Sequence, residues 1–244
     1  MNKTILITGS TSMIGTEIAK LLAKKQYNII LHYNKSEERA NLLKEELIND
    51  YHIECMTIRC DLKEEKEIDE MLNKLPNIDI LINNAAIELN SDFNDKTFST
   101  FEEVLKTNLI GPFVLSKHLG SLMYKNKYGK IINISSNNAI DQYDPSTIEY
   151  DVSKAGLISL THNLALQYAP YVNVNAISPG WIKTDPVNKL NKELNGMLEQ
   201  EESKKILKER FGEPKEVASL VAYLISDEAE YINNEVIRID GGIR

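Results

Sequence analysis

Residues 3–15 read KTILITGSTSMIG, an apolar run followed by a glycine-containing turn and the start of a helix. The run Lys3–Thr8 has the composition of a buried parallel strand, and it ends at Gly9. Apolar residues then recur at helical spacing from Ile14 to Leu22. A strand, a glycine turn and a helix in this order predict a dinucleotide-binding unit, in which the pyrophosphate lies on the N–H groups that begin the helix. The glycines alone would fit an ordinary tight turn equally well.

The rest of the chain alternates strand-like and helix-like segments. This alternation predicts an α/β fold, with a doubly wound, Rossmann-type, seven-stranded parallel sheet and helices on both faces. No internal repeat or linker-like stretch divides the sequence, so we expect residues 1–244 to form one domain. The six further runs that we expect to form strands are Asn28–Tyr33, Cys55–Cys60, Ile78–Ile82, Lys130–Ser135, Val172–Ile177 and Glu235–Ile239.

The stretch 133–154 carries the most reactive combination of side chains. We expect Tyr150 and Lys154 to lie on one face of a helix, because residues four apart are neighbours there. An adjacent ammonium would lower the pKa of the phenol, and a shift from about 10 to about 7 corresponds to about 4 kcal/mol. Such a tyrosine is a general acid and base for a carbonyl/alcohol pair. The spacing alone is uninformative, since a chain this rich in tyrosine and lysine contains one such pair by chance.

Two other features place polar groups near this pair. Ser135 and Ser136 end the strand that precedes the helix, and either could contact a substrate oxygen. Asn108 lies within the long helical region Thr97–Asn126, just before Gly111-Pro112. Proline must kink this helix or begin a second one, so we expect distorted backbone at Asn108 with groups free for a ligand or a water molecule.

The residues after the second strand bear on the choice of cofactor. An NAD site usually has an acidic residue there to bind the ribose 2′-hydroxyl. This chain has Asn34, Lys35 and Ser36 instead, which suit the 2′-phosphate of NADP(H). Ser36 could equally be a plain helix N-cap, because Glu37 and Glu38 follow it, and Lys35 could be a solvated surface charge.

Composition excludes several classes of function. The formal net charge of −8 argues against nucleic acid or an anionic membrane as the main partner. No apolar run is long enough to span a membrane, and the two cysteines with no secretory signal indicate a cytoplasmic protein. His52, Cys55 and Cys60 match no usual zinc spacing, so we expect no metal.

Two segments could govern the substrate. The charge-rich segment 185–211 follows the sixth strand and is either a solvated helix pair or, as we predict, a mobile lid. An acidic carrier protein would need a basic patch beside the site, and Lys125, Lys127 and Lys130 are the available lysines. The overall negative charge would weaken that attraction, so we expect free carbonyl substrates to be used at least as well as carrier-bound ones.

With these motifs in order, the chain resembles the short-chain dehydrogenase/reductase family along essentially its full length, and it looks closest to the 3-oxoacyl-thioester reductase branch. The motifs that carry the resemblance are TGSTSMIG, Asp61, NNAA at 83–86, Asn108, ISS, YDVSK, SPGWIKTD and the terminal DGG. Three positions depart from the family pattern: Met13, Ala86 and Asn234 each replace a glycine. Met13 would place a side chain near the adenosine.

The resemblance implies a catalytic tetrad of Asn108, Ser136, Tyr150 and Lys154. Tyr150 would exchange the proton with the substrate oxygen, Ser136 (rather than its rival Ser135) would hold that oxygen, Lys154 would also bind the nicotinamide ribose, and Asn108 would position a water. It further implies cofactor contacts, which together with those read from the residues are Gly9, Ser10, Ile14, Asn34, Lys35, Ser36, Asp61, Leu62, Asn83, Ala85, Tyr150, Lys154, Pro179, Gly180, Ile182 and Thr184.

The expected function is hydride transfer between NADP(H), with NAD(H) as the alternative cofactor, and a small-molecule carbonyl or secondary alcohol. A 3-oxoacyl thioester or a small ketone is the leading substrate class. One alternative is an NAD(P)-dependent sugar or polyol dehydrogenase, and another is a nucleotide-binding redox sensor without catalysis. The intact Asn-Ser-Tyr-Lys set speaks against a pure sensor. The family resemblance also implies a homotetramer, or a homodimer, built on the helices at 97–126 and 147–169.

Overall fold

The computed structural model describes residues 2–243 and contains one seven-stranded sheet. All neighbouring strands are parallel, in the order β3-β2-β1-β4-β5-β6-β7. This is the doubly wound arrangement that the alternating sequence pattern predicts, and every predicted strand is present with its ends shifted by at most two residues. The strands are β1 Thr4–Ile7, β2 Asn28–Tyr33, β3 Cys55–Arg59, β4 Ile80–Asn83, β5 Gly129–Ile134, β6 Val172–Pro179 and β7 Val236–Ile239.

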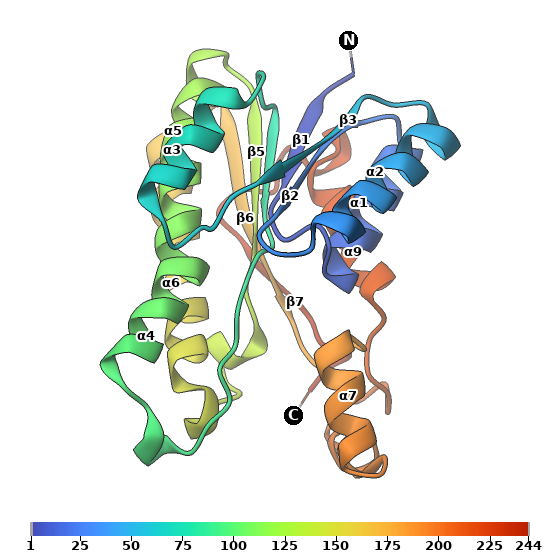
Figure 1. The fold of residues 1–244 in the computed structure, drawn as a ribbon. Helices are drawn as coiled ribbons and strands as arrows, with labels where there is room; N and C mark the ends of the chain where they lie inside the picture. Colours follow the sequence, from blue (N-terminus) through green and yellow to red (C-terminus); the bar gives the residue numbers. More distant parts are fainter. Residues whose placement is uncertain (1, 244) are drawn as a thin grey trace.

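Helices cover both faces of the sheet (Figure 1). One face packs against α1 (Met13–Lys24), α2 (Glu37–Tyr51) and α9 (Pro214–Leu224), through a core that includes Ile18, Leu43 and Val221. The other packs against α3 (Glu65–Lys74), α5 (Gly111–Lys125) and α6 (Ile148–Tyr168), through a core that includes Met71, Leu115 and Leu164. The five central strands are buried on both faces, which explains why most of them read as continuous apolar runs, whereas the edge strands β3 and β7 are partly exposed.

The helical region before β5 is not broken at its proline. Helix α4 (Phe98–Leu105) continues through a π-helical turn, Lys106–Ile110, directly into α5. Pro112 lies in the first turn of α5, where its missing N–H removes the donor that the carbonyl of Asn108 would otherwise receive. The predicted interruption is therefore a widened turn, and Asn108 lies inside it.

The segment 185–211 forms α7 (Asp185–Glu193), α8 (Met197–Glu202) and a 3₁₀ turn, Ser203–Lys205. Helix α7 projects beyond the carboxyl ends of the strands (Figure 1). The base of the segment is fixed, because Phe211 is buried and stacks on Trp181 with 5.3 Å between ring centroids. Apolar side chains on its outer part remain exposed, at Leu190, Leu194 and Met197.

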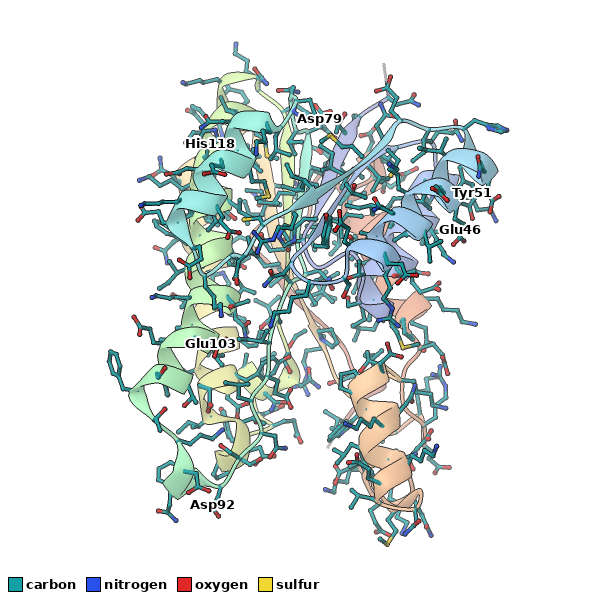
Figure 2. The ribbon with its side chains drawn as sticks, in the orientation of Figure 1. Glu46, Tyr51, Asp79, Asp92, Glu103 and His118 are labelled. Atoms are coloured by element: carbon teal, nitrogen blue, oxygen red, sulfur yellow. The ribbon has the colours of Figure 1, made fainter. Side chains whose placement is uncertain are left out.

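Lys130, one of the three lysines considered for a carrier-protein patch, does not lie at the carboxyl ends of the strands. Lys130 is 1% exposed, and its ammonium donates to the carbonyl of Ser226 at 2.9 Å and to Glu230 at 2.8 Å. Lys130 is the second residue of β5, so it lies at the amino-terminal edge of the sheet. Asp79 marks that edge in Figure 2, and Asp92 lies at the opposite end of the molecule. The prediction that Lys130 contributes to a patch beside the active site was wrong.

Candidate active site

The glycine turn leaves the start of α1 open to an anion. Gly9 has φ +61°, and a Cβ there would lie 2.8 Å from the Cα of Ala85, so only glycine fits at this contact between two loops. Ser12 caps α1 by accepting the N–H of Gly15 at 3.1 Å. Asn84 braces the turn by donating to the carbonyls of Thr8 and Gly9 at 2.9 and 3.0 Å. The N–H groups at the first turn of a helix are the usual binding site of a dinucleotide pyrophosphate.

His32 fixes the glycine turn through a hydrogen bond to Gly9, a role that sequence analysis missed. Its Nδ1 accepts the N–H of Gly9 at 3.1 Å, and its Nε2 lies 3.0 Å from the carbonyl of Cys60. Burial lowers the pKa of His32 to about 4, so the ring is neutral, with Nε2 as the donor. The N–H and the hydroxyl of Ser10 both donate to the His32 carbonyl at 3.0 Å. Ser10 is fully buried and both of its donors are used in these bonds, so its predicted contact with a cofactor stays a prediction that these bonds do not favour.

The predicted 2′-phosphate residues lie together after β2. Lys35 is exposed and forms no ion pair with another residue of 2–243. Ser36 occupies the N-cap position of α2, but its side chain makes no capping hydrogen bond, so the hydroxyl is not used in the way that a plain cap would require. Arg59 approaches from β3 and donates to the carbonyl of Asn34 at 3.5 Å. This guanidinium is a further cation near the expected phosphate that sequence analysis did not single out.

Asp61 and Leu62 follow β3 on the same edge of the sheet. The Asp61 carboxylate accepts the N–H of Lys63 at 3.1 Å, and it remains partly exposed, as a ligand contact requires. Leu62 is buried, and a Cβ on Gly111 would meet it at 3.0 Å. Ala85 is partly exposed and lies against Gly9, as described above.

The amide of Asn83 belongs to a buried hydrogen-bond chain instead. Its Nδ2 donates to Ser116 on α5 at 3.0 Å and to Asn133 on β5 at 2.8 Å. Asn133 in turn donates to Thr161 on α6 at 2.8 Å, and Thr161 donates to the carbonyl of Leu157. Asn83 is 2% exposed, so a contact of Asn83 with a cofactor would have to come from its main chain.

The residues after β6 provide the opposite side of the edge. Gly180 donates its N–H to the carbonyl of Ile239 at 3.1 Å, directly after Pro179. Ile182 is 5% exposed and packs in the core, so its predicted contact with a cofactor would have to come from its main chain. Thr184 is partly exposed at the start of α7, and its hydroxyl makes no capping bond. Ile14, in the first turn of α1, packs partly against the same core.

The two candidate serines have different tasks. The hydroxyl of Ser135 donates to the main-chain carbonyl of Lys154 at 2.9 Å, which ties the end of β5 to α6. Ser136 lies beside Tyr150, where its hydrogen bond acts to lower the pKa of the phenol. Ser136 also accepts the N–H of Asn138 at 3.3 Å. The geometry therefore brings Ser136, rather than Ser135, to the reactive tyrosine.

Tyr150 and Lys154 lie on one face of α6, as their spacing predicts, with the ammonium 5.5 Å from the centre of the phenol ring. The predicted lowering of the tyrosine pKa is not observed in the protein alone. Burial, and then the negative charge of Glu88, raise the pKa of Tyr150 above its ordinary value, so the phenol holds its proton. Burial lowers the pKa of Lys154 to about 8. The sequence pattern shows the neighbouring lysine, but not the burial and the carboxylate that together raise the pKa of Tyr150.

Asn108 uses its side chain to fix a loop. Its Nδ2 donates to the carbonyl of Ile87 at 2.9 Å, and its Oδ1 accepts the N–H of the same residue at 2.9 Å. The same Nδ2 lies 3.1 Å from the hydroxyl of Ser153 on α6. The side chain of Asn108 is fully buried and its amide protons are used in these bonds, so we expect a bond to water to come from its main-chain carbonyl, which Pro112 leaves without an α-helical donor.

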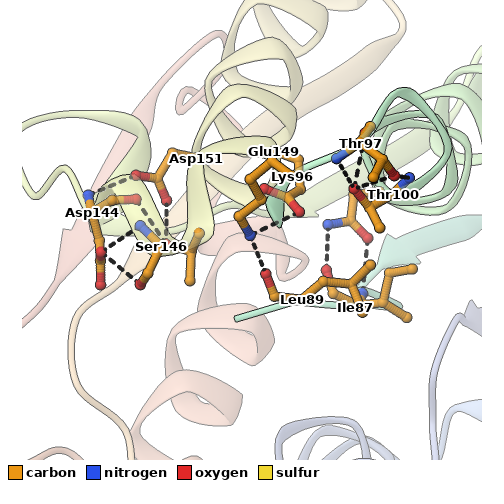
Figure 3. Close-up of polar contacts among 11 residues, drawn as sticks. Ile87, Leu89, Lys96, Thr97, Thr100, Asp144, Ser146, Glu149 and Asp151 are labelled. Atoms are coloured by element: carbon orange, nitrogen blue, oxygen red, sulfur yellow. Dashed lines mark hydrogen bonds and ion pairs between the residues drawn. The ribbon is translucent and has the colours of Figure 1, made fainter. Parts of the chain in front are cut away.

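A buried ion pair, also missed from the sequence, lies on the other side of this loop. Lys96 donates to the carbonyl of Leu89 at 2.6 Å and to Glu149 at 3.0 Å (Figure 3). The side chains of Lys96 and Glu149 are 8% and 0% exposed. Glu149 directly precedes Tyr150, so this pair fixes the loop against the turn that carries the tyrosine.

The described residues offer no metal site. Within residues 2–243, no three His, Cys, Asp or Glu side chains come together closely enough to hold an ion. Burial raises the pKa of both Cys55 and Cys60 to about 12, which disfavours the thiolate that a metal would need. Over the same residues, no helix has the length and apolar character that crossing a membrane requires.

Comparison with known proteins decides the family. The model of a family described as enoyl-(acyl carrier protein) reductase matches residues 9–244. The chain belongs to the short-chain dehydrogenase/reductase family. The 3-oxoacyl-[acyl-carrier-protein] reductase of Aquifex aeolicus is 38% identical over 246 residues, which cover 99% of this chain and 97% of that protein. The corresponding reductase of Rickettsia felis is 37% identical over 242 residues, with 99% and 96% covered.

Solved structures of short-chain dehydrogenases/reductases share the fold. The L-sorbose reductase of Gluconobacter frateurii, in complex with NADPH and L-sorbose, superimposes with a TM-score of 0.92 at 25% identity, covering 99% of this chain and 96% of that chain. As a member of the family, this short-chain dehydrogenase/reductase is an NAD(P)-dependent oxidoreductase.

Proposed function

We propose that this short-chain dehydrogenase/reductase reduces the keto group of a 3-oxoacyl thioester with NADPH. The observation that carries the proposal is the meeting of Ser136, Tyr150 and Lys154 at the strand ends, beside an open glycine turn. Curated relatives at 33–38% identity are named 3-oxoacyl-[acyl-carrier-protein] reductases. They support a thioester more than the sugar or polyol alternative.

The chain provides a fitting cradle for NADPH. Because Gly9 has no Cβ, the glycine turn can pack closely against Ala85. We propose that this turn leaves the start of α1 open for the pyrophosphate. Lys35 offers an unpaired cation and Ser36 an uncapped hydroxyl, which together suit the 2′-phosphate. We infer a preference for NADPH over NADH from these two groups.

When bound, the reduced nicotinamide supplies the hydride, and the side chains manage the proton. Tyr150 donates its phenolic proton to the carbonyl oxygen as that oxygen gains negative charge, and its raised pKa keeps the phenol protonated before the reaction. Ser136 donates a hydrogen bond to the same oxygen. Lys154, mostly charged at neutral pH, stabilises the phenolate that forms. The main-chain carbonyl of Asn108 would hold a water that returns a proton.

We infer that segment 185–211 closes over the substrate. Its anchored base at Phe211 and its exposed apolar residues, such as Leu190 and Leu194, support a lid that covers an acyl chain. We also propose a cytoplasmic location, in line with the two free cysteines, and a homotetramer. Exposed apolar residues on the helices expected to form that assembly, such as Phe98 and Leu166, support the tetramer. Light scattering in solution tests the assembly.

The deciding experiment is a panel of 3-oxoacyl thioesters, simple ketones and sugars, each assayed with NADPH and NADH. The proposal expects the highest kcat/KM for a thioester with NADPH. A sugar or polyol that exceeded every thioester would replace it with the alternative. Matched carrier-bound and free thioesters across a salt series then separate the two forms of substrate. We expect no large carrier advantage, because Lys130 lies at the opposite edge and is paired.

A further inference from the structure

The loop residues 87–91 run alongside the turns of α6 that carry Tyr150. Three contacts tie the two segments together in antiparallel order. Ile87 is bound by Asn108, which also contacts Ser153. Leu89 is bound by Lys96, which also holds Glu149 (Figure 3). The N–H of Ser91 donates to the carbonyl of Ser146 at 3.2 Å.

Glu88 lies between the first two of these ties, and so it is held beside Tyr150. Solvent reaches its side chain, and its carboxylate makes no hydrogen bond or ion pair with another residue of the described chain. Its charge nevertheless acts on the two reactive groups. It raises the pKa of Tyr150 after burial does, and it opposes the lowering of the pKa of Lys154.

The other charged groups around this point are already engaged. Asp151 accepts hydrogen bonds from Asn138 at 2.9 Å and from Thr147 at 3.2 Å. Asp144 accepts from the N–H and the hydroxyl of Ser146 at 2.8 and 2.7 Å. The ammonium groups of Lys96 and Lys154 are bound to Glu149 and to the carbonyl of Ile134.

The pKa of Glu88 is raised, because the protein around it and two nearby carboxylates disfavour its charged form. Although solvent reaches it, desolvation by the surrounding protein comes first among the causes that raise its pKa, and the charges of Asp151 and Asp144 follow. Lys154 and Lys96 act in the opposite direction. Within residues 2–243, Glu88 thus combines solvent access with a carboxylate that has no hydrogen-bond or ion-pair partner, and its charge acts on Tyr150.

We propose that Glu88 is a specificity-determining residue that excludes substrates with a negative charge next to the reacting carbonyl. The inference rests on the proposed function, and it narrows the substrate class. A 3-oxoacyl thioester is neutral around its keto group, whereas the corresponding free 3-oxo acid places a carboxylate two carbons away. Two like charges separated by several ångströms in a partly hydrated site repel each other. Solvent screening limits the penalty to about threefold to tenfold in kcat/KM.

The test compares the neutral and the anionic form of one substrate. The two substrates are 3-oxobutanoyl-N-acetylcysteamine and 3-oxobutanoate, assayed with NADPH in the wild type, Glu88→Gln, Glu88→Lys and a control, Glu45→Gln. Glu45 is an exposed glutamate on α2, away from the site, and Glu88 is exposed too, so all variants are expected to fold. Thermal unfolding checks this directly.

We expect Glu88→Gln to raise kcat/KM for the acid about threefold to tenfold relative to the thioester. Glu88→Lys should raise the same ratio further, and Glu45→Gln should leave it unchanged. An unchanged ratio in both Glu88 variants, including no detectable use of the acid by any of them, would overturn the inference while leaving thioester reduction intact. If the wild type reduces the acid but no thioester, the proposed function fails instead.

The pH dependence of the reverse reaction provides a second readout. Oxidation of the 3-hydroxybutanoyl thioester requires Tyr150 as the base, so its rate rises as the phenol loses its proton. Removing the negative charge of Glu88 makes the phenolate easier to form, and the rise should move to lower pH in Glu88→Gln. A rise at the same pH as in the wild type would show that Glu88 does not act on the reacting groups.

Discussion

The ammonium nitrogen of Lys154 lies 2.7 Å from the carbonyl oxygen of Ile134, the last residue of β5. The same strand end continues into Ser135 and Ser136, and Ser135 returns a hydrogen bond to the carbonyl of Lys154. Strand and helix therefore hold each other through two reciprocal bonds that involve one residue of α6. This double tie positions the strand end that carries Ser136 against the helix that carries Tyr150, the two residues that we propose share the substrate oxygen.

The first prediction concerns the proton donor. Tyr150→Phe removes the transferable proton, so kcat should fall about 10²- to 10⁴-fold. Binding of NADPH, measured by quenching of Trp181 fluorescence, should change less than about twofold, because the ring itself remains in place. Near wild-type turnover in this variant would show that another group is the acid.

The second prediction concerns the lysine. Lys154→Met should weaken both NADPH binding and turnover, since the ammonium is expected to contact the ribose and to stabilise the phenolate. In the binding assay, Lys154→Met should lose more NADPH affinity than Tyr150→Phe, whose affinity we expect to be almost unchanged. A variant that lost only kcat, with unchanged NADPH affinity, would contradict the role at the ribose.

The third prediction concerns cofactor choice. Wild-type enzyme should prefer NADPH over NADH by about tenfold or more in kcat/KM, which corresponds to about 1.4 kcal/mol. Lys35→Asp should erode or reverse this ratio, because it places a negative charge where the 2′-phosphate is expected. Lys125→Asp makes the same charge change at the opposite edge of the sheet and serves as the control. A preference that survived Lys35→Asp would place the phosphate elsewhere, with Arg59 the first residue to examine.

The fourth prediction concerns stability. Lys96→Met leaves the fully buried Glu149 without its partner and should lower the free energy of unfolding by about 3–5 kcal/mol in urea titrations. Adding Glu149→Met should restore much of the loss, because it removes the unpaired charge. Lys189→Met breaks a surface pair with Glu193 and should cost less than about 1 kcal/mol. Equal losses for Lys96→Met and Lys189→Met would count against a buried pair.

The fifth prediction concerns acid. The pKa of His32 is about 4 in the folded protein and about 6.5 when unfolded, so the unfolded chain binds the extra proton first. The stability that the neutral ring contributes is complete above pH 6.5 and is lost as the pH falls toward 4, up to about 3 kcal/mol. His32→Asn should lack this part of the acid dependence in urea titrations. Parallel curves for both proteins would show that the ring is not held neutral.

The sequence predicts the fold well because the central strands are buried on both faces and the edge strands β3 and β7 still form short runs between helices. Such strands are short apolar runs, and those starting at Asn28, Cys55 and Val172 begin at the predicted residue. The ends are less predictable, since β6 continues through Ser178-Pro179 beyond the apolar run. The order of the strands follows from the family resemblance and the alternation with helices, and no single residue determines it.

The site is predictable only where a motif records it. Tyr150, Lys154 and Ser136 come together as expected, because one helix and one strand end carry them. His32 and Glu149 were missed, since a lone histidine or glutamate in a sequence gives no sign that it will be buried. The raised pKa of Tyr150 depends first on its burial and then on Glu88, which is 62 residues earlier in the chain and is held near it by the ties at Ile87 and Leu89.

The amide chain from Asn83 through Asn133 to Thr161 has one possible direction, because its last hydroxyl must donate to the carbonyl of Leu157. Each amide nitrogen is then a donor, and the hydrogen bonds run in one direction, from Asn83 on β4 through Asn133 on β5 to Thr161 on α6. Replacing either asparagine with aspartate would put acceptor against acceptor with no water to intervene. Positions 83 and 133 therefore do not accept aspartate, although aspartate has nearly the same shape as asparagine.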